Sequence, residues 1–215
     1  MSRGLGDVYK RQVYALLGAV EWGYEEDGAT LLAHLEKIVQ YNVQSSEKEK
    51  FDGVMLDIEP YISDSWKENP EEYMDRYISC MKKGYKFAQK NHLRTAICIP
   101  RHYDNQGLTS GLEELIKETC DEVAVMNYSC GNEIEAIRTE AALSEKYGKE
   151  LHCILEFQEV GKHGLTENKT YRNKGIDNAK ETWEKLQKEY KNINVTRDYH
   201  WSRPVREMLE EKNAD

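Results

Sequence analysis

The chain has 215 residues, of which 39% are hydrophobic and 32% charged, so it is long enough for one domain with a sizeable core. Its formal net charge is −9 and it has no long basic tract, which argues against nucleic acid or an anionic membrane as a partner. No apolar run approaches the roughly 20 residues of a membrane-spanning helix.

Short apolar runs alternate with amphipathic stretches along the chain. The first of them predict a strand over 13–20, a helix over 30–43 and a strand over 51–58. The alternation continues to the last residues, and it predicts strands over 95–99, 122–128, 151–157 and 195–201 and helices over 70–91, 112–119, 132–147, 178–190 and 205–212. Strands that alternate with helices indicate a parallel sheet, either doubly wound or closed into a barrel.

Charged and aromatic residues gather just after the predicted strands. They are Trp22, Glu59 to Tyr61, Arg101 to Tyr103, Tyr128, Glu156 to Glu159 and Tyr199 to Trp201. Active sites of (β/α) barrels are built at the ends of many strands in this way, and no glycine-rich phosphate loop follows any strand. We therefore predict an α/β fold of the (β/α)8 TIM-barrel type, incomplete at about six strands because a full barrel has eight.

The strand over 51–58 carries an acidic pair. Alternation places Met55, Asp57 and Glu59 on one face and the apolar residues Val54, Leu56 and Ile58 on the other. The apolar face suits contact with helices, so the acidic face is expected to point into the barrel. Two neighbouring carboxylates at a partly buried site repel each other, and such pairs are typically kept for acid–base chemistry.

Residues 51–59 (FDGVMLDIE) are similar to the fourth-strand motif of glycoside hydrolase family 18, the chitinase family. That motif reads D-G-x-D-x-D-x-E, and the chain matches it at Asp52, Gly53, Asp57 and Glu59. The chain departs from the motif at Met55, where the family has an inner aspartate.

Two further segments resemble the same family in the same order. Met126 to Tyr128 resembles its sixth-strand M-x-Y motif, although Ser129 replaces the aspartate that follows, and Trp201 lies where the family has a tryptophan under the reacting sugar. The resemblance numbers the six strands as three to eight. It implies that 13–215 is an N-terminally truncated glycoside-hydrolase-like barrel. Residues 1–12 have no usable periodicity and no signal-peptide h-region, and we expect them to be a non-native leader.

The resemblance implies a hydrolase that acts on β-linked glycans containing N-acetylglucosamine and needs no cofactor. Glu59 would be the general acid, Asp57 would orient the N-acetyl group whose carbonyl oxygen attacks the anomeric carbon, and Tyr128 would bind the same group. Because Met55 and Ser129 remove polar groups that the family uses, a carbohydrate-binding protein without catalysis is an alternative. A partial barrel that does not function alone is another, since an open sheet exposes its edges.

Glu156 gives a further alternative, since a glutamate at the end of the seventh strand is the nucleophile in many other barrel glycosidases. Glu59 and Glu156 would then form a retaining pair with carboxyl groups about 5–5.5 Å apart. The remaining candidates for sugar contacts are Trp22, Tyr61, Arg101, Met126, Tyr199, His200 and Trp201, for most of which core packing or loop structure is the competing interpretation.

Metal binding finds little support, since the six histidines lack H-x-x-x-H and H-x-H spacing. The five cysteines form no C-x-x-C pair and are interpreted as free, largely buried thiols. A carbohydrate is the expected partner. The sequence leaves the oligomeric state open, and it does not decide between a cytoplasmic and a secreted location.

Overall fold

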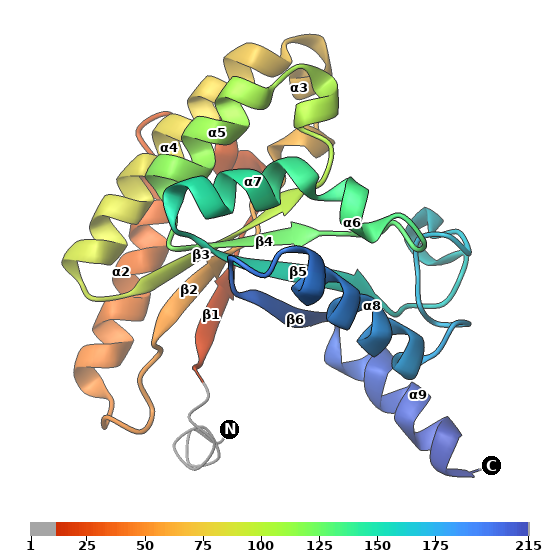
Figure 1. The fold of residues 1–215 in the computed structure, drawn as a ribbon. Helices are drawn as coiled ribbons and strands as arrows, with labels where there is room; N and C mark the ends of the chain where they lie inside the picture. The colour runs from red at the N-terminus through yellow and green to blue at the C-terminus, as the bar shows by residue number, and fades with distance from the viewer. Residues whose placement is uncertain (1–11, 215) are drawn as a thin grey trace. The chain divides into compact units, whose positions relative to one another are not determined.

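The computed structural model of the protein describes residues 12–214 (Figure 1). These residues form two compact units, of which the first comprises 12–99 and 103–122 and the second 100–102 and 123–214. The described residues contain six strands in alternation with helices, in the order that the sequence predicts. The leader expected over 1–12 lies outside the described residues, apart from Gln12.

The first unit is built on three parallel strands: β1 (Tyr14–Leu17), β2 (Gly53–Leu56) and β3 (Arg94–Pro100). In the register of the strands Ala15 pairs with Val54, and Val54 pairs with Thr95. The helices α2 (Ala29–Gln44), α4 (Pro70–Lys90) and α5 (Thr109–Thr119) cover one face of these strands (Figure 1). Pro70 occupies the first turn of α4, where its missing N–H is not needed.

Burial along β2 follows the predicted alternation. Val54, Leu56 and Ile58 are at most 1% exposed, whereas Met55, Asp57 and Glu59 are half-buried. The chain after β1 approaches β2 very closely, because a Cβ atom placed on Gly18 would lie 1.9 Å from the carbonyl oxygen of Asp57. Glycine at position 18 thus allows the two strand ends to meet.

A polar cluster lies at the opposite end of the strands in the first unit. Tyr14 donates a hydrogen bond of 2.5 Å to Glu122 Oε1, and Arg94 Nε lies 2.5 Å from the same oxygen. The Glu122 side chain is only 3% exposed, so Arg94 neutralises a buried carboxylate. Since Tyr14, Arg94 and Glu122 are at the starts of their strands, this cluster supports the fold rather than an active site.

Four short elements of the first unit follow the strands and were missed by the sequence prediction: η1 (Val20–Tyr24), η2 (Pro60–Ile62), α3 (Asp64–Glu68) and η3 (Asp104–Gln106). Only α3 carries a recognisable signal. Its N-cap residue Ser63 accepts a hydrogen bond from the backbone N–H of Trp66 at 3.1 Å. The others are single turns that hydrophobic periodicity does not detect.

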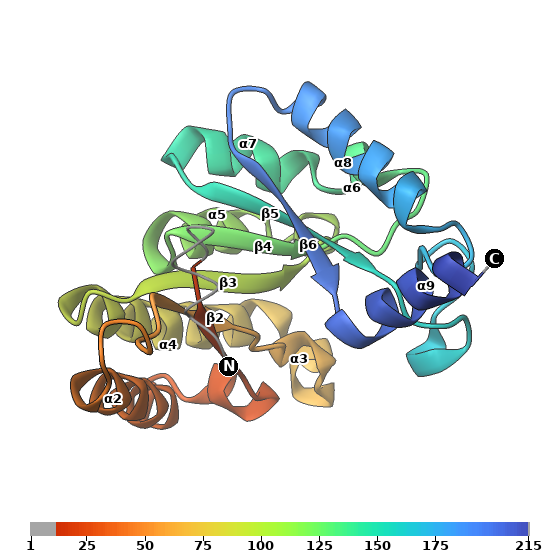
Figure 2. The same ribbon diagram turned by 90° about the horizontal axis from the view of Figure 1, so that it is seen from below.

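The second unit contains β4 (Glu122–Met126), which begins at the last residue of the first unit, β5 (Glu150–Glu156) and β6 (Val195–His200). β5 and β6 are parallel, and their register runs from Leu151 opposite Val195 to Glu156 opposite His200. The helix α8 (Ile176–Glu189) packs against these strands, and the Trp183 indole N–H donates to the Cys153 carbonyl at 3.0 Å (Figure 2).

The helix expected over 132–147 is two helices, so this prediction was wrong. α6 (Glu133–Ala136) and α7 (Arg138–Tyr147) are separated by Ile137, whose φ of −125° and ψ of 19° are not helical. The turn buries the Ile137 side chain completely, a tertiary gain that overrides the helical pattern. α7 ends at Gly148 in the left-handed conformation, as predicted, and α9 (Ser202–Ala214) follows β6.

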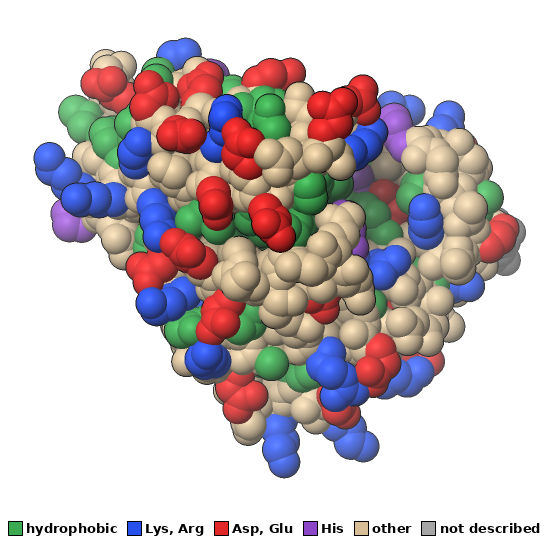
Figure 3. All heavy atoms as spheres, turned by 90° about the horizontal axis from the view of Figure 1, so that it is seen from above, with side chains coloured by type: hydrophobic (Ala, Val, Ile, Leu, Met, Phe, Trp, Pro, Cys, Tyr) green, Lys and Arg blue, Asp and Glu red, His purple; other side chains and the backbone are tan. Residues whose placement is uncertain are grey.

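The thiols follow the expectation from the sequence. Acidic and basic side chains are interspersed over the face of the molecule in Figure 3. None of the helices in residues 12–214 is long and apolar enough to cross a membrane. The five cysteines, all within the described residues, form no disulfide; Cys130 is half-buried, and Cys80, Cys98, Cys120 and Cys153 are buried.

Candidate functional site

The acidic pair of the first unit lies at the end of β2. Asp57 continues the strand pairing, since its backbone N–H donates to the Leu17 carbonyl at 2.8 Å. Glu59 precedes η2, and its Oε1 accepts a hydrogen bond from the hydroxyl of Tyr61. Both residues are half-buried, and one carboxylate oxygen of Asp57, Oδ1, is itself buried.

A group of aromatic rings packs next to Asp57 and Glu59, and it contacts Glu59 through Tyr61. The rings of Tyr61 and Tyr103 pack edge to face, with centroids 6.0 Å apart. The Trp66 ring stacks on Tyr103 with a centroid distance of 5.6 Å. Burial raises the pKa of Tyr61 far above its ordinary value, as does its hydrogen bond to Glu59. Burial also raises the pKa of the fully buried Tyr77 on α4, with a smaller contribution from the charge of Asp57. These phenols therefore stay neutral at physiological pH.

Trp22 occupies a different environment. It belongs to η1 after β1, and its ring lies 4.5 Å from the ring of His34 on α2. The indole is half-buried in this contact. Packing against a helix therefore accounts for at least one face of Trp22.

The polar centre of the second unit is Glu156, the last residue of β5, which is 2% exposed. Its Oε1 accepts the backbone N–H groups of Phe157 and Gln158, each at 2.7 Å, and its Oε2 lies 2.7 Å from His200 Nδ1 and 3.1 Å from Gln158 Nε2. Burial acts to raise the pKa of Glu156, but the hydrogen bonds from His200 and Gln158 outweigh it and hold that pKa below its ordinary value.

Tyr128 lies beside this pair, and its ring centroid is 5.9 Å from that of His200. Met126 and Tyr128 are half-buried, whereas Asn127 between them is buried and donates to the Glu133 carbonyl at 2.9 Å. Met126 and Tyr128 therefore lie on one face of the chain, and Asn127 lies on the opposite face. The structure brings Tyr128, Glu156 and His200 together, although they are far apart in sequence.

Tyr199 does not join this group, although it is next to His200 in the sequence. Its ring packs against Trp183 at 4.8 Å and Phe157 at 5.4 Å, on the side of the strands that α8 covers. Alternation along β6 places neighbouring residues on opposite faces. Tyr199 therefore packs on this side, and 39% of the residue remains exposed.

Trp201 and Arg101 complete the predicted set in the second unit. Trp201 is 46% exposed and lines a hollow of about 420 Å³ together with Gln158, Lys162 and Arg172. The peptide bond between His200 and Trp201 is cis. Arg101 is half-buried after the end of β3.

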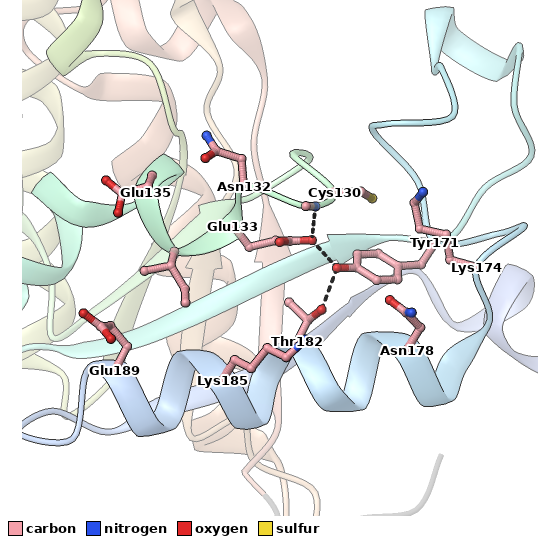
Figure 4. Close-up of a pocket in the computed structure, with 12 residues that line it drawn as sticks. Cys130, Asn132, Glu133, Glu135, Tyr171, Lys174, Asn178, Thr182, Lys185 and Glu189 are labelled. Carbon is pink, nitrogen blue, oxygen red and sulfur yellow. Dashed lines mark hydrogen bonds between the residues drawn. The ribbon is translucent and has the colours of Figure 1, made fainter.

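A second hollow, of about 720 Å³, lies between α6 and α8 (Figure 4). Glu133 lines this hollow, and its Oε1 accepts hydrogen bonds from the Gly131 N–H, at 2.8 Å, and from the Tyr171 hydroxyl. The Tyr171 hydroxyl also lies 2.8 Å from Thr182 Oγ1. Sequence analysis did not identify this network, because Glu133 and Tyr171 belong to no motif and meet only through the fold. The network joins α6 to α8.

The long connection between β5 and α8 is anchored at Glu156. The Tyr171 N–H donates to the Glu156 carbonyl at 2.8 Å, and Thr170 Oγ1 donates to the Gln158 carbonyl at 2.7 Å. The connection therefore starts and returns beside the same residue. Among residues 12–214, no three histidine, cysteine or acidic side chains are grouped so that they could hold a metal ion.

Comparison with known proteins supports the fold. A dihydropteroate synthase from Anaplasma phagocytophilum, with bound 6-hydroxymethylpterin-monophosphate, is 10% identical, and the match covers 94% of this chain and 73% of that chain at a TM-score of 0.56. At this identity the likeness shows the fold alone. It confirms the prediction of a TIM-barrel-like α/β fold with six parallel strands.

Two structures of catalytic domain 2 of the group II chitinase from Ostrinia furnacalis also match, one of them a mutant in complex with penta-N-acetylchitooctaose. Both are 14% identical, and the matches cover 72% of this chain at TM-scores of 0.45 and 0.43. The chain spans about half of these chitinase chains, 47% in each case. No family model and no curated protein matches the chain.

Proposed function

We propose that this protein is a retaining glycoside hydrolase that acts on β-linked glycans containing N-acetylglucosamine. The observation that carries the proposal is the pair Asp57 and Glu59, on one half-buried face at the carboxyl end of β2. Carboxyl ends of the strands are where barrel enzymes place their catalytic groups. The roles that we assign to Asp57 and Glu59 come from the similarity of residues 51–59 to the chitinase motif.

The reaction follows from the roles of the two carboxyl groups. Glu59, in its protonated form, donates its proton to the glycosidic oxygen as the bond between that oxygen and the anomeric carbon breaks. The carbonyl oxygen of the substrate's N-acetyl group forms a new bond to the anomeric carbon, and Asp57 accepts a hydrogen bond from the acetamido N–H. Water then attacks the anomeric carbon, the bond between that carbon and the acetamido oxygen breaks, and Glu59 takes a proton from the attacking water. Tyr61, which donates to Glu59, would fix the orientation of the acid.

The two-carboxylate mechanism has less support. A nucleophile needs an oxygen that can approach the anomeric carbon. Both oxygens of Glu156 already accept two hydrogen bonds each, and the residue is 2% exposed. Glu156 is better suited to hold neighbouring groups than to attack a sugar.

Substitution of the acid tests the proposal. Glu59→Gln keeps the shape of the side chain but cannot donate the proton, so turnover of chitotetraose should fall by at least about 100-fold. Glu36→Gln, on the exposed face of α2, is the matched control and should retain full turnover. Equal turnover by the wild type and the Glu59→Gln variant would contradict the proposal.

A thiazoline that mimics the cyclic intermediate distinguishes the mechanisms. It should inhibit the enzyme if the acetamido group is the nucleophile, whereas a covalent sugar adduct on Glu156 would select the two-carboxylate route. A non-catalytic sugar-binding protein is a second candidate, because Met55 places an apolar side chain on the face of the acidic pair. Glycan binding without turnover, unchanged by Glu59→Gln, would select it.

A further inference from the structure

Two pairs of histidine and carboxylate lie on the same face of β5 and β6. Near the start of the strands His152 Nδ1 is 3.0 Å from Asp198 Oδ2, and at their carboxyl end His200 Nδ1 is 2.7 Å from Glu156 Oε2. In the first pair β5 supplies the histidine, and in the second it supplies the carboxylate. The fold thus contains two chemically similar pairs, of which only the second is at the end where barrel ligands bind.

The carboxylate of the second pair is held much more tightly than that of the first. The Glu156 side chain is 2% exposed and accepts three hydrogen bonds besides the one from His200, two of them from backbone N–H groups. The Asp198 side chain is 25% exposed, and its other oxygen is 3.3 Å from the Thr196 hydroxyl. A carboxylate fixed by the backbone sets the position of any group bonded to it.

This arrangement fixes the tautomer of His200. Glu156 is ionised at neutral pH and can only accept hydrogen bonds, so the proton of a neutral His200 must be on Nδ1. Nε2 then carries a lone pair on the far side of the ring from Glu156. The His200 side chain is 43% exposed, so a ligand can reach it. Two titratable groups that lie against the ring are Glu156 from β5 and Tyr128 from the segment after β4.

We propose that His200 contacts the glycan directly, by accepting a hydrogen bond from a sugar hydroxyl at Nε2, and that Glu156 is the positioning residue that fixes its tautomer. The inference rests on the proposed function for the identity of the ligand. Tyr128, beside the His200 ring, would contact the same sugar residue. In this assignment Glu156 takes no part in bond formation to the sugar.

The variant Glu156→Gln separates positioning from packing. Two backbone N–H groups would hold the amide oxygen of the new side chain at the place of Oε1, which leaves its NH2 group against His200 Nδ1. An NH2 group donates, so His200 must move its proton to Nε2, and the atom offered to the ligand changes from acceptor to donor. The shape of the site remains nearly unchanged.

Two measurements on the full chain test the inference. Ring nitrogen chemical shifts of His200, assigned with a His200→Gln variant, report the tautomer without any ligand. We expect the proton on Nδ1 in the wild type and on Nε2 in Glu156→Gln. Calorimetric titration with chitotetraose should show binding about 10-fold weaker in Glu156→Gln, since an acceptor for a sugar hydroxyl is lost.

Asp198→Asn is the matched control, because it makes the same change in the other pair. It should alter the tautomer of His152, leave that of His200 unchanged and alter chitotetraose binding by less than about twofold. An unchanged His200 tautomer in Glu156→Gln would overturn the inference, as would chitotetraose binding to the wild type without a shift at His200 Nε2. Absence of any binding to the wild type would instead contradict the proposed function.

Discussion

At the scale of residues, the two buried carboxylates Glu122 and Glu156 are stabilised by different kinds of partner. Glu122 is neutralised by Arg94 and bonded to Tyr14, an arrangement that supports the fold. Glu156 is surrounded by donors, of which only His200 can carry a charge. Buried carboxylates need such compensation, and the kind of donor decides whether the group can respond to a change of pH.

The lowered pKa of Glu156 predicts acid sensitivity. A carboxyl group whose pKa is lower in the folded than in the unfolded state stabilises the fold above its ordinary pKa, here 4.5, and that stabilisation is lost as the pH falls through the folded pKa. The free energy of unfolding should therefore decrease between about pH 6 and about pH 3, with a shallower decrease in Glu156→Gln. Urea titrations at the two pH values measure the free energy of unfolding of each protein. An equal decrease with pH in the wild type and in Glu156→Gln would refute the prediction.

At the scale of elements, the approach of the segment after β1 to β2 depends on one missing side chain. A methyl group on Gly18 would meet the backbone of Asp57 at 1.9 Å, and backbone cannot rotate away as a side chain can. Gly18→Ala should lower the free energy of unfolding by about 1–3 kcal/mol, as overpacked sites do, and should weaken chitotetraose binding because Asp57 must move.

Gly107→Ala provides the comparison for this variant. Its added methyl group would have no atom within 4 Å, so only its positive φ of 78° opposes the change, at roughly 1 kcal/mol. It should leave glycan binding intact. Urea denaturation of both variants gives the two free energies. If Gly18→Ala is no less stable than Gly107→Ala, steric closeness at the end of β1 is not important.

The strands and long helices were predictable because each is a run of one periodicity. The half-buried face of β2, for example, follows from alternation alone. The break at Ile137 was not predictable, since its helical neighbours continue the pattern and only burial in the fold explains the turn. The single-turn elements η1, η2 and η3 are too short for any period to appear.

The candidate site was predictable in residue type but not in arrangement. Sequence analysis placed Tyr199, His200 and Trp201 in one cluster, whereas alternation in β6 sends Tyr199 to the face that α8 covers. It also found Glu156 but could not foresee that two backbone N–H groups and His200 saturate its oxygens. The Glu156–His200 contact joins residues 44 positions apart, and no local pattern encodes it.

At the scale of the whole molecule, the five thiols report on the integrity of the fold. Cys130 is half-buried, and burial raises its pKa to about 11, with a further contribution from the charge of Glu133, so it should react slowly with a disulfide reagent at neutral pH. The four buried cysteines should react only when the protein unfolds. We expect one thiol to react in the native protein and five in denaturant.

A Cys130→Ser variant is the control for this measurement. It should show no reaction in the native state and four thiols in denaturant. Rapid reaction of several thiols in the native protein would mean that the cores of the two units open readily, which contradicts the burial of Cys80, Cys98, Cys120 and Cys153. The same assay reports whether each variant discussed above is folded.

The connection between β5 and α8 leaves Glu156 and returns to it, and the contacts that fix its two ends are made by Phe157, Gln158, Thr170 and Tyr171. The segment 159–164 between these ends is exposed, so substitutions there should leave both ends in place. It borders the hollow beside Trp201 through Lys162 and His163. Under the proposed function, laboratory grafts at this segment should therefore change which glycans bind while the Glu156–His200 pair stays intact.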